Sequence, residues 1–229
     1  MILTAHQPAY MPWLGLFDKI AKSDLYCYLD TVQYQKNDFN NRNKIKISTG
    51  EMWLTVPVES KNHLEKKVGE IKIVQNSWQK KHIKSLKNAY QKSPYLNKYI
   101  SDISEIIQTY SKNTLGELNL AMLKYFLNKL NIKTKIIVAS DYSFQGKKSD
   151  LILDICKKIG ATEYIFGAQG KNYANIDSFT EGRIKVSFQE YNPPTYPQLY
   201  GNFIPNLSIV DLLFNVGDEA LIYILKEDY

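Results

Sequence analysis

Two prolines near the N-terminus restrict what this chain can fold into. Pro8 and Pro12 lie within residues 6–15, between an apolar start and a short helical pattern. Proline fixes φ and lacks a backbone N–H, so the segment can be neither a regular helix nor a central strand. Each proline also favours an extended conformation in the residue before it. We therefore expect a stiff loop that follows a first strand and presents His6, Gln7, Tyr10 and Trp13.

The flanking segments place this loop in a larger unit. Residues 1–5 predict a buried strand, residues 14–21 a helix of about two turns, and residues 25–29 a second buried strand. Strand, helix and strand within thirty residues are typical of a βαβ unit with parallel strands. Open α/β sheets bind ligands at the carboxyl ends of their strands. We expect the first loop, and the polar loop of residues 30–43, to lie at that edge.

Regular elements continue along the rest of the chain. Residues 44–47 and 52–58 predict a hairpin with Gly50 in its turn, and residues 68–74 a further strand. Helices are expected at residues 77–91, 95–110, 114–130, 150–159 and 219–225, and strands at residues 135–139, 164–166 and 184–188. The pattern predicts one α/β domain over residues 1–229, Rossmann-like, with a mixed, mostly parallel sheet. We expect residues 1–74 and 132–229 to form its core and residues 75–131 a helical insertion.

Individual residues mark several helix ends. Ser77, Ser149 and Ser208 are expected N-caps, because a serine hydroxyl can accept a bond from a free backbone N–H of the first turn. Thr114 and Glu117 have the spacing of a capping box. Gly160 is expected to end the helix before it.

Composition limits the partners and the compartment. The net charge is +6, but lysine carries almost all of the positive charge and no basic tail is present, so nucleic acid is not an expected partner. No apolar run reaches the ~20 residues that span a bilayer, and the N-terminus lacks a signal-peptide pattern. We expect a cytoplasmic protein without membrane insertion, in which Cys27 and Cys156 are buried thiols.

Arginine is rare enough to be informative. Only Arg42 and Arg183 are arginines among 29 basic residues. Where lysine would serve, this chain uses lysine, so Arg42 indicates a need for a planar guanidinium that binds a phosphate or a carboxylate. An ion pair with Asp30 or Asp38 is the alternative. Arg183 lies before a predicted strand, in what reads as a turn.

The standard catalytic motifs are absent. The sequence has no P-loop, no dinucleotide fingerprint, no nucleophile elbow and no histidine or cysteine spacing typical of zinc. His6 has the pKa range of a general base, or it satisfies loop backbone. Residues 167–170 can bring backbone amides to a phosphate, or form a plain tight turn. The candidate catalytic residues are His6 and Lys36. The candidate binding residues are Gln7, Tyr10, Trp13, Asp30, Gln33, Asn41, Arg42, Asn43, Gly167, Gly170, Tyr173 and Gln198.

Several motifs together resemble one family. Residues 6–15 read His-Gln-Pro-x-Tyr-x-Pro-Trp-x-Gly, residues 41–46 read Asn-Arg-Asn-x-Ile-Lys, and residues 53–58 read Trp-Leu-Thr-Val-Pro-Val. Further matches, from Trp78 to Gly217, continue in the same order over nearly the whole chain. The sequence closely resembles the WbqC-like family. That family is associated with bacterial surface-polysaccharide and O-antigen gene clusters, and some members are labelled glycine or aminoacyl transferases.

The resemblance implies a transferase or ligase. We predict that it attaches an amino acid, glycine among the candidates, or another acyl group to an amino sugar or nucleotide-linked sugar. The alternative is a non-catalytic sugar- or nucleotide-binding protein of the same pathway. A weaker similarity links residues 8–15 to adenylyl-transferring enzymes such as pantothenate synthetase, which would imply ATP. Those enzymes carry His-x-Gly-His where this chain has Trp-Leu-Gly-Leu, so His6 and Lys36 would have to replace both histidines. The donor, the acceptor, the use of ATP and a homodimer are left open.

Overall fold

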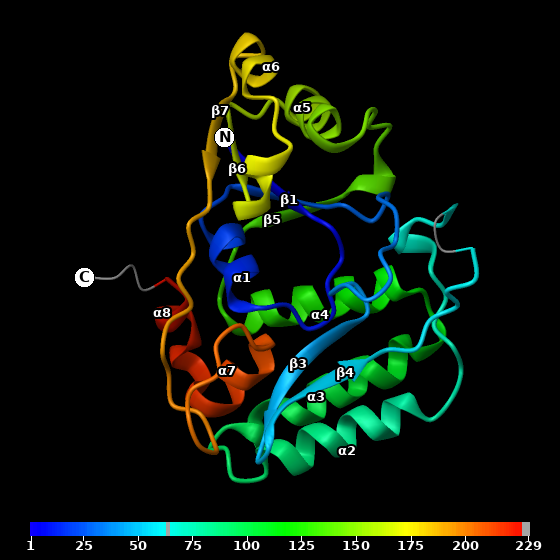
Figure 1. Cartoon of the computed structure of the whole chain (residues 1–229), viewed down its shortest axis with the longest axis vertical. Helices are drawn as coiled ribbons and strands as arrows, with labels where there is room; N and C mark the ends of the chain where they lie inside the picture. The colour runs from blue at the N-terminus through cyan, green and yellow to red at the C-terminus, as the bar shows by residue number, and fades with distance from the viewer. Residues whose placement is uncertain (63–64, 226–229) are drawn as a thin grey trace.

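A five-stranded parallel sheet forms the centre of the protein in a computed structural model that describes residues 1–62 and 65–225 (Figure 1). Its strands are β1 (Ile2–His6), β2 (Leu25–Tyr28), β5 (Lys135–Val138), β6 (Glu163–Phe166) and β7 (Lys185–Phe188). They lie in the order β5-β2-β1-β6-β7, and each neighbouring pair is parallel. The prediction of a Rossmann-like α/β fold is confirmed.

The strand order reverses at the middle of the sheet. From β1 the chain builds outward through β2 to β5, then crosses to the other side of β1 and adds β6 and β7. The carboxyl ends of β1 and β6 therefore flank the topological switch point. In open α/β sheets the connections diverge at this point and leave a crevice that binds ligands.

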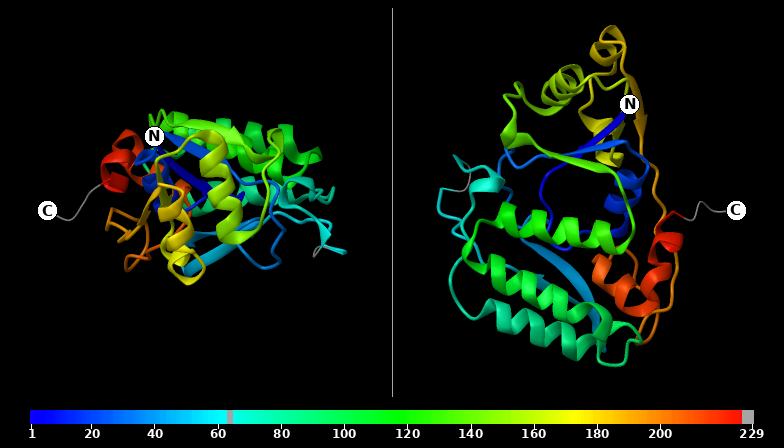
Figure 2. Two further views of the ribbon diagram at one scale, coloured as in Figure 1. Left: turned by 90° about the horizontal axis from the view of Figure 1, so that it is seen from above. Right: turned by 180° about the vertical axis from the view of Figure 1, so that it is seen from behind.

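Helices cover both faces of the sheet (Figure 2). Helices α5 (Lys148–Ile159) and α6 (Ile176–Glu181) lie on one face and share a core with Leu3 and Cys27. Helices α1 (Leu14–Ala21), α4 (Leu115–Lys129), α7 (Ile209–Val216) and α8 (Ala220–Leu225) share the other core, which includes Tyr26 and Tyr28. None of the helices in the described part of the chain is long and apolar enough to cross a membrane.

A separate hairpin packs into this second core. Strands β3 (Arg42–Ile47) and β4 (Gly50–Thr55) pair antiparallel and form their own two-stranded sheet. Helices α2 (Trp78–Tyr90) and α3 (Leu96–Thr109) lie beside the hairpin on the same side of the parallel sheet (Figure 1). The hairpin and helices α2 to α4 contribute to one continuous core with α1 and α7. The division into an α/β core and a helical insertion stays a prediction.

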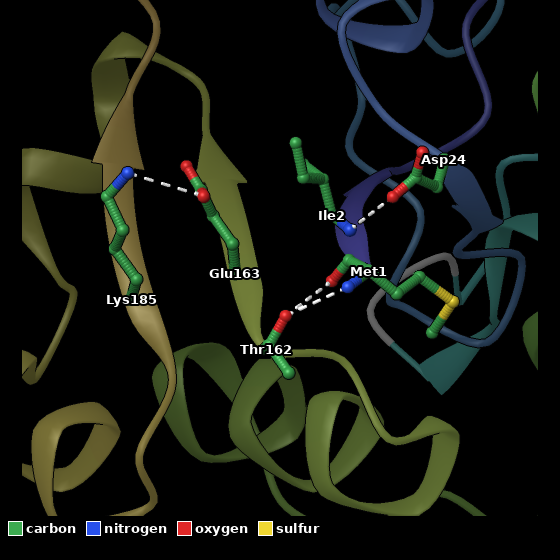
Figure 3. A network of polar contacts seen from close by, with 6 residues as sticks. All are labelled: Met1, Ile2, Asp24, Thr162, Glu163 and Lys185. Carbon is green, nitrogen blue, oxygen red and sulfur yellow. Dashed lines mark hydrogen bonds and ion pairs between the residues drawn. The ribbon is translucent and has the colours of Figure 1, made fainter.

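The amino edge of the sheet is fixed by the start of the chain (Figure 3). The Met1 amino group donates to the Thr162 hydroxyl at 2.8 Å, and the Ile2 amide donates to the Asp24 carboxylate at 2.7 Å. On the neighbouring strands, Lys185 Nζ lies 3.4 Å from a Glu163 carboxylate oxygen. These contacts hold β1 in register with β2 and β6 at the end opposite the two polar loops.

The local signals at helix ends are partly confirmed. The Thr114 hydroxyl accepts from the Glu117 amide at 3.3 Å while the Glu117 carboxylate accepts from the Thr114 amide at 2.8 Å, which is the predicted capping box. Ser208 caps α7, and Gly160 ends α5 with a φ of 75°. Ser77 occupies the N-cap position of α2 as predicted, but its hydroxyl makes no capping bond, and the Asn76 side chain accepts from the Trp78 amide. The N-cap prediction for Ser149 is wrong, because α5 begins at Lys148 and the Ser149 hydroxyl accepts from the Asn175 amide.

The strand expected at residues 68–74 is also wrong. Its first part forms the short 3-10 helix Val68–Glu70, followed by single bridges from Lys72 to Thr114 and from Ile73 to Val58. The loop after β2 takes up the backbone donors of this segment, because the amides of Val68 and Gly69 donate to the carbonyls of Val32 and Asp30 at 2.8 and 2.9 Å. Among the described residues, no continuous strand pairs with residues 68–74.

Candidate functional site at the carboxyl edge

The first two loops lie together at the carboxyl edge, as the βαβ pattern predicts. The Tyr10 amide donates to the Phe39 carbonyl at 3.0 Å, and the Asn40 side chain donates to the Pro8 carbonyl at 2.7 Å. The side-chain amide nitrogen of Gln7 donates to an Asp38 carboxylate oxygen at 3.1 Å. These bonds join the loop after β1 to the loop after β2 and make them one wall.

A row of rings runs along this wall. The His6 and Trp13 ring centroids are 5.3 Å apart, those of Trp13 and Phe39 are 5.6 Å apart, and those of Phe39 and Trp53 are 5.8 Å apart. We call His6, Trp13, Phe39 and Trp53 the aromatic row. Trp53, on β4, is 39% exposed, so part of its face is open to solvent. Aromatic faces of this kind suit a sugar or a nucleotide base.

Two cations lie on the exposed end of the row. The Arg42 guanidinium is 4.3 Å from the centroid of the Trp53 ring, and Lys44 Nζ is 5.1 Å from the same ring. Arg42 Nη2 donates to the Asn37 carbonyl, whereas its Nε is buried without a hydrogen-bond partner among the described residues. The recorded contacts of Arg42 are thus with an aromatic ring and a neutral carbonyl, which leaves its charge available to an anion.

His6 is the last residue of β1 and is half-buried, not part of an exposed loop as expected. Its Nδ1 lies 2.7 Å from the Gln7 carbonyl oxygen. A carbonyl can only accept, so Nδ1 carries the proton and Nε2 presents a lone pair. Burial, followed by the nearby charge of Lys19, lowers the pKa of His6 to about 3. The imidazole is therefore neutral near pH 7.

Lys19 is a residue of this edge that we did not predict as a site residue. It lies on α1 and is only 3% exposed, with Nζ 3.0 Å from the Ala5 carbonyl oxygen at the end of β1. Burial lowers the pKa of Lys19 to about 8. The sequence signal for Lys19 was its position between Phe17 and Ile20 in the apolar helix of residues 14–21. A lysine there has to be buried unless its side chain bends out to solvent.

The glycine segment after β6 lies at the same edge of the sheet, on the other side of the switch point, and we call it the second wall. Residues Ala168–Asn172 form a short 3-10 helix, and Gly167 precedes it in an extended conformation. Gly170 packs directly against Phe166, since a Cβ placed on Gly170 would lie 2.5 Å from the Phe166 Cβ. Gly170 is therefore required for packing. Tyr173 is 44% exposed and contacts Phe166 edge-on at 5.9 Å between ring centroids.

Three residues that we expected to contact a substrate are buried and occupied. Tyr10 is completely buried, with its hydroxyl 3.0 Å from His82 Nδ1, so the structure does not place it where a ligand could reach it. The Asn43 side chain donates to the Met11 carbonyl at 2.8 Å and to the Tyr10 carbonyl at 3.3 Å. The Asn41 side chain donates to the Val56 carbonyl at 2.8 Å. Asn41 and Asn43 hold the first loop and the hairpin together, and Tyr10 joins the first loop to α2.

Gln198 belongs to a different, mostly buried network. Its amide nitrogen donates to Asp211 at 2.9 Å, and its oxygen accepts from Lys46 Nζ at 3.0 Å. Asp211 also accepts from the hydroxyls of Tyr90 and Tyr196 at 2.7 and 2.8 Å. Burial raises the pKa of Asp211, and the bonds from the two phenols oppose that shift. The network ties the segment after β7 to β3 and α7.

The remaining candidates lie in the loop after β2. An Asp30 carboxylate oxygen accepts from the Ser140 amide at 2.9 Å and so joins the ends of β2 and β5. Gln33 is exposed and forms a single backbone bridge with Lys67. Lys36 is exposed in the same loop.

Two open surface depressions of about 400 and 520 Å³ lie away from this edge, one beside the start of β2 and β5 and one between α3 and α4.

The fold and this edge define the class of protein: a Rossmann-like α/β protein with an aromatic and cationic site beside the switch point of its sheet. The chain belongs to the WbqC-like protein family, whose model matches residues 7–223. It is 35% identical over 219 residues, 95% of each chain, to Rv1507c of Mycobacterium tuberculosis (strain ATCC 25618 / H37Rv), a protein described as uncharacterized. No solved structure matches the chain.

Proposed function

We propose that the protein transfers an amino acid or another acyl group to an amino sugar, free or nucleotide-linked, during assembly of a bacterial surface polysaccharide. The observation that carries the proposal is the aromatic row that ends in the pair Trp53 and Arg42. Sugars present flat C–H faces that pack on aromatic rings, and a linked phosphate or the carboxylate of a donor pairs with a guanidinium. The family name WbqC-like is consistent with polysaccharide chemistry.

The two ends of the aromatic row are proposed to have different roles, one in binding and one in proton transfer. Trp53 is partly exposed and lies against Arg42, while Lys44 beside it is paired with Glu51, so Arg42 makes this end suit the sugar and its anionic group. His6 lies at the other end, beside Trp13 and next to the switch point. Trp13 between them can hold the sugar so that an amino substituent points toward Nε2 of His6. Lys36, exposed in the adjoining loop, is proposed to pair with the phosphate or carboxylate from outside.

Amide formation at this wall would need one proton acceptor. The amine nitrogen bonds to the acyl carbon of an activated donor, its proton passes to His6 Nε2, and the bond from the acyl carbon to its leaving group breaks. The Gln7 carbonyl holds Nδ1–H and thereby fixes the tautomer in which Nε2 is the acceptor. An anionic group near Lys19 would offset the charge that lowers the pKa of His6 and make Nε2 a stronger base.

A mass measurement tests this proposal. The purified protein is incubated with nucleotide-linked amino sugars, a panel of amino acids and ATP, and the sugars are analysed for a mass gain of one acyl group. Turnover should fall by about 10²-fold or more in His6→Gln, which keeps a polar side chain but removes the base. Trp53→Ala should raise KM more than it lowers kcat. Unchanged sugars across the whole panel would contradict the proposal.

A non-catalytic binding protein is the second candidate, and one observation favours it. A histidine with a pKa near 3 is a weak base in the empty site, so the wall can bind a sugar without reacting with it. This candidate predicts that nucleotide-linked sugars raise the melting temperature without turnover, because a ligand that binds only the native state stabilises it. It also predicts normal binding by His6→Gln and weaker binding by Trp53→Ala.

A further inference from the structure

Lys19 brings a buried positive charge to the switch point. It lies in the second turn of α1, and helical side chains point back toward the helix N-terminus, which carries its Nζ to the carboxyl end of β1. Its recorded hydrogen bond is to the neutral Ala5 carbonyl at 3.0 Å. An ammonium group is costly to bury unless an opposite charge compensates it. The described contacts show no carboxylate that does so.

The acidic neighbour of Lys19 is already paired elsewhere. Asp18 is 1% exposed, and one of its carboxylate oxygens lies 2.8 Å from Lys22 Nζ. Its other oxygen accepts from the Gln189 amide at 2.6 Å. Asp18 therefore neutralises Lys22 on the adjacent side of α1. The charge of Lys19 is left without a matching anion among the described residues.

Gly167 leaves space in front of this charge. A Cβ placed on Gly167 would find one heavy atom within 4 Å among the described residues outside its chain neighbours, and that atom is Lys19 Nζ at 3.8 Å. Gly170, three residues later, has no such space because Phe166 fills it. The φ of Gly167 is −69°, an ordinary value for any residue, so backbone strain does not explain a glycine here. The absent side chain instead leaves room next to the ammonium.

We propose that this space between the carboxyl ends of β1 and β6 binds an oxyanion, with the Lys19 ammonium as its counter-charge. The N-terminal end of α1 faces the same edge and adds a partial positive charge. The inference rests on the proposed function, which supplies two sources of the oxyanion: the phosphate of a nucleotide-linked sugar and the carboxylate of an amino-acid donor. Arg42 would then pair with the other of these two anions, and Trp53 with the sugar, at the far end of the aromatic row.

Calorimetric titration of the whole protein with two probes, inorganic pyrophosphate and acetate, tests the proposal. Binding of pyrophosphate alone assigns the site to a phosphate, and binding of acetate alone assigns it to a carboxylate. Lys19→Met keeps a long, flexible side chain without charge and should weaken binding by about tenfold or more. The matched control is Lys22→Met at the C-cap of the same helix, where the side chain is 43% exposed and its loss should change affinity less than about twofold.

Gly167→Ala provides an independent test that leaves every charge in place. Its methyl group would enter the space beside Lys19 Nζ at an ordinary contact distance, so the protein should fold while probe affinity falls by about tenfold. This variant keeps the proposal testable if Lys19→Met does not fold. No heat with either probe, or affinities in Lys19→Met and Gly167→Ala equal to that of the wild type, would overturn the proposal.

The outcome is separable from that of the proposed function. Binding that depends on Lys19 without acyl transfer leaves the oxyanion site in place and removes the transferase. Acyl transfer without binding of either probe would support the transferase and rule out the oxyanion site. A structural role for Lys19 predicts that Lys19→Met melts at a lower temperature and still binds the probes. The oxyanion site predicts a melting temperature equal to or above that of the wild type, since a buried uncompensated charge is removed.

Discussion

The Tyr10 hydroxyl donates to Nδ1 of His82 across 3.0 Å, and both side chains are buried. The other ring nitrogen of His82 lies 3.0 Å from the Thr55 carbonyl oxygen, so Nε2–H donates there and Nδ1 has to accept. One neutral imidazole thus connects α2 to the proline-bounded loop and to β4. Protonation of His82 would place a second donor opposite the tyrosine hydroxyl and leave a buried charge.

Stability should fall as the pH drops from about 6.5 to about 4. Burial lowers the pKa of His82 from 6.5 to about 4, so in this window the unfolded chain binds a proton that the folded protein does not. Above the unfolded value the contribution is constant, and below the folded value it is lost. The slope is about 1.4 kcal/mol per pH unit for each such histidine, and the lowered pKa of His6 adds a second. Urea unfolding at a series of pH values measures it.

His82→Gln is the matched variant for this prediction. Between pH 4 and 6.5 it should lower the slope of the unfolding free energy against pH by the contribution of one proton. The contribution of His6 should remain. An unchanged slope would show that His82 does not control the acid sensitivity.

Arg42→Lys should weaken binding of a nucleotide-linked sugar by about tenfold. The substitution keeps the charge but removes the planar group that lies 4.3 Å from the Trp53 ring, an interaction worth about 1–2 kcal/mol. Calorimetry or fluorescence of the exposed tryptophan measures the loss. Arg183→Lys, at an exposed position before β7, is the control and should bind like the wild type. Equal affinities of Arg42→Lys and Arg183→Lys would mean that charge alone matters at position 42.

Gly170→Ala and Gly167→Ala should differ in stability. The added methyl group at position 170 meets Phe166 at 2.5 Å and forces repacking, which costs about 1–3 kcal/mol. At position 167 the backbone φ is normal for alanine, so the methyl group fits. Alanine also lowers the conformational entropy of the unfolded chain, so Gly167→Ala should be as stable as the wild type or more stable by about 0.4–1 kcal/mol. Chemical denaturation of both variants compares them directly. A more stable Gly170→Ala would contradict the packing reason for Gly170.

Asn43→Ala should destabilise the protein by about 1–3 kcal/mol. The side chain is completely buried, and its loss leaves the carbonyls of Met11 and Tyr10 without that donor. Met11 has a φ of 42°, an unfavourable value for a side chain of its kind, so the bond also supports a strained residue. Urea unfolding measures the loss. Lys36→Ala, exposed in the adjoining loop, should stay within about 0.5 kcal/mol of the wild type.

The fold was predictable where the signals are local. The apolar strands, the helix of residues 14–21 and the two prolines act within a few residues of one another, and they correctly predicted β1, α1 and β2 with two loops at one edge. The glycine-containing hairpin and the Thr114 capping box are local in the same sense. The strand prediction for residues 68–74 failed because their backbone bonds go to several separate segments, the loop after β2, residues 57–59 and Leu115, and strand periodicity does not report such partners.

The site residues show the same limit more strongly. Tyr10 looked available because its loop is polar, but its partner His82 is 72 residues away, and only the folded chain shows that the tyrosine is buried. Gln198 likewise depends on Asp211 and Lys46, which come from other elements. Lys19 carried a usable sequence signal, because it is a charged residue on the apolar side of a short helix. Trp53 had no sequence signal beyond its motif, because it acquires its neighbours only in the fold: Arg42 on the paired strand β3 and Phe39 in the loop after β2.

The bonds between the first two loops have a consequence for motion. Phe39, Asn40 and Asn43 contact the backbone of the proline-bounded loop, so that loop, the loop after β2 and the hairpin have to move as one body. The segment after β6 lacks comparable ties to this body in the described contacts. A ligand that enters between the two walls is therefore accommodated mainly by displacement of the segment that starts at Gly167, and hydrogen exchange on ligand binding should slow there first.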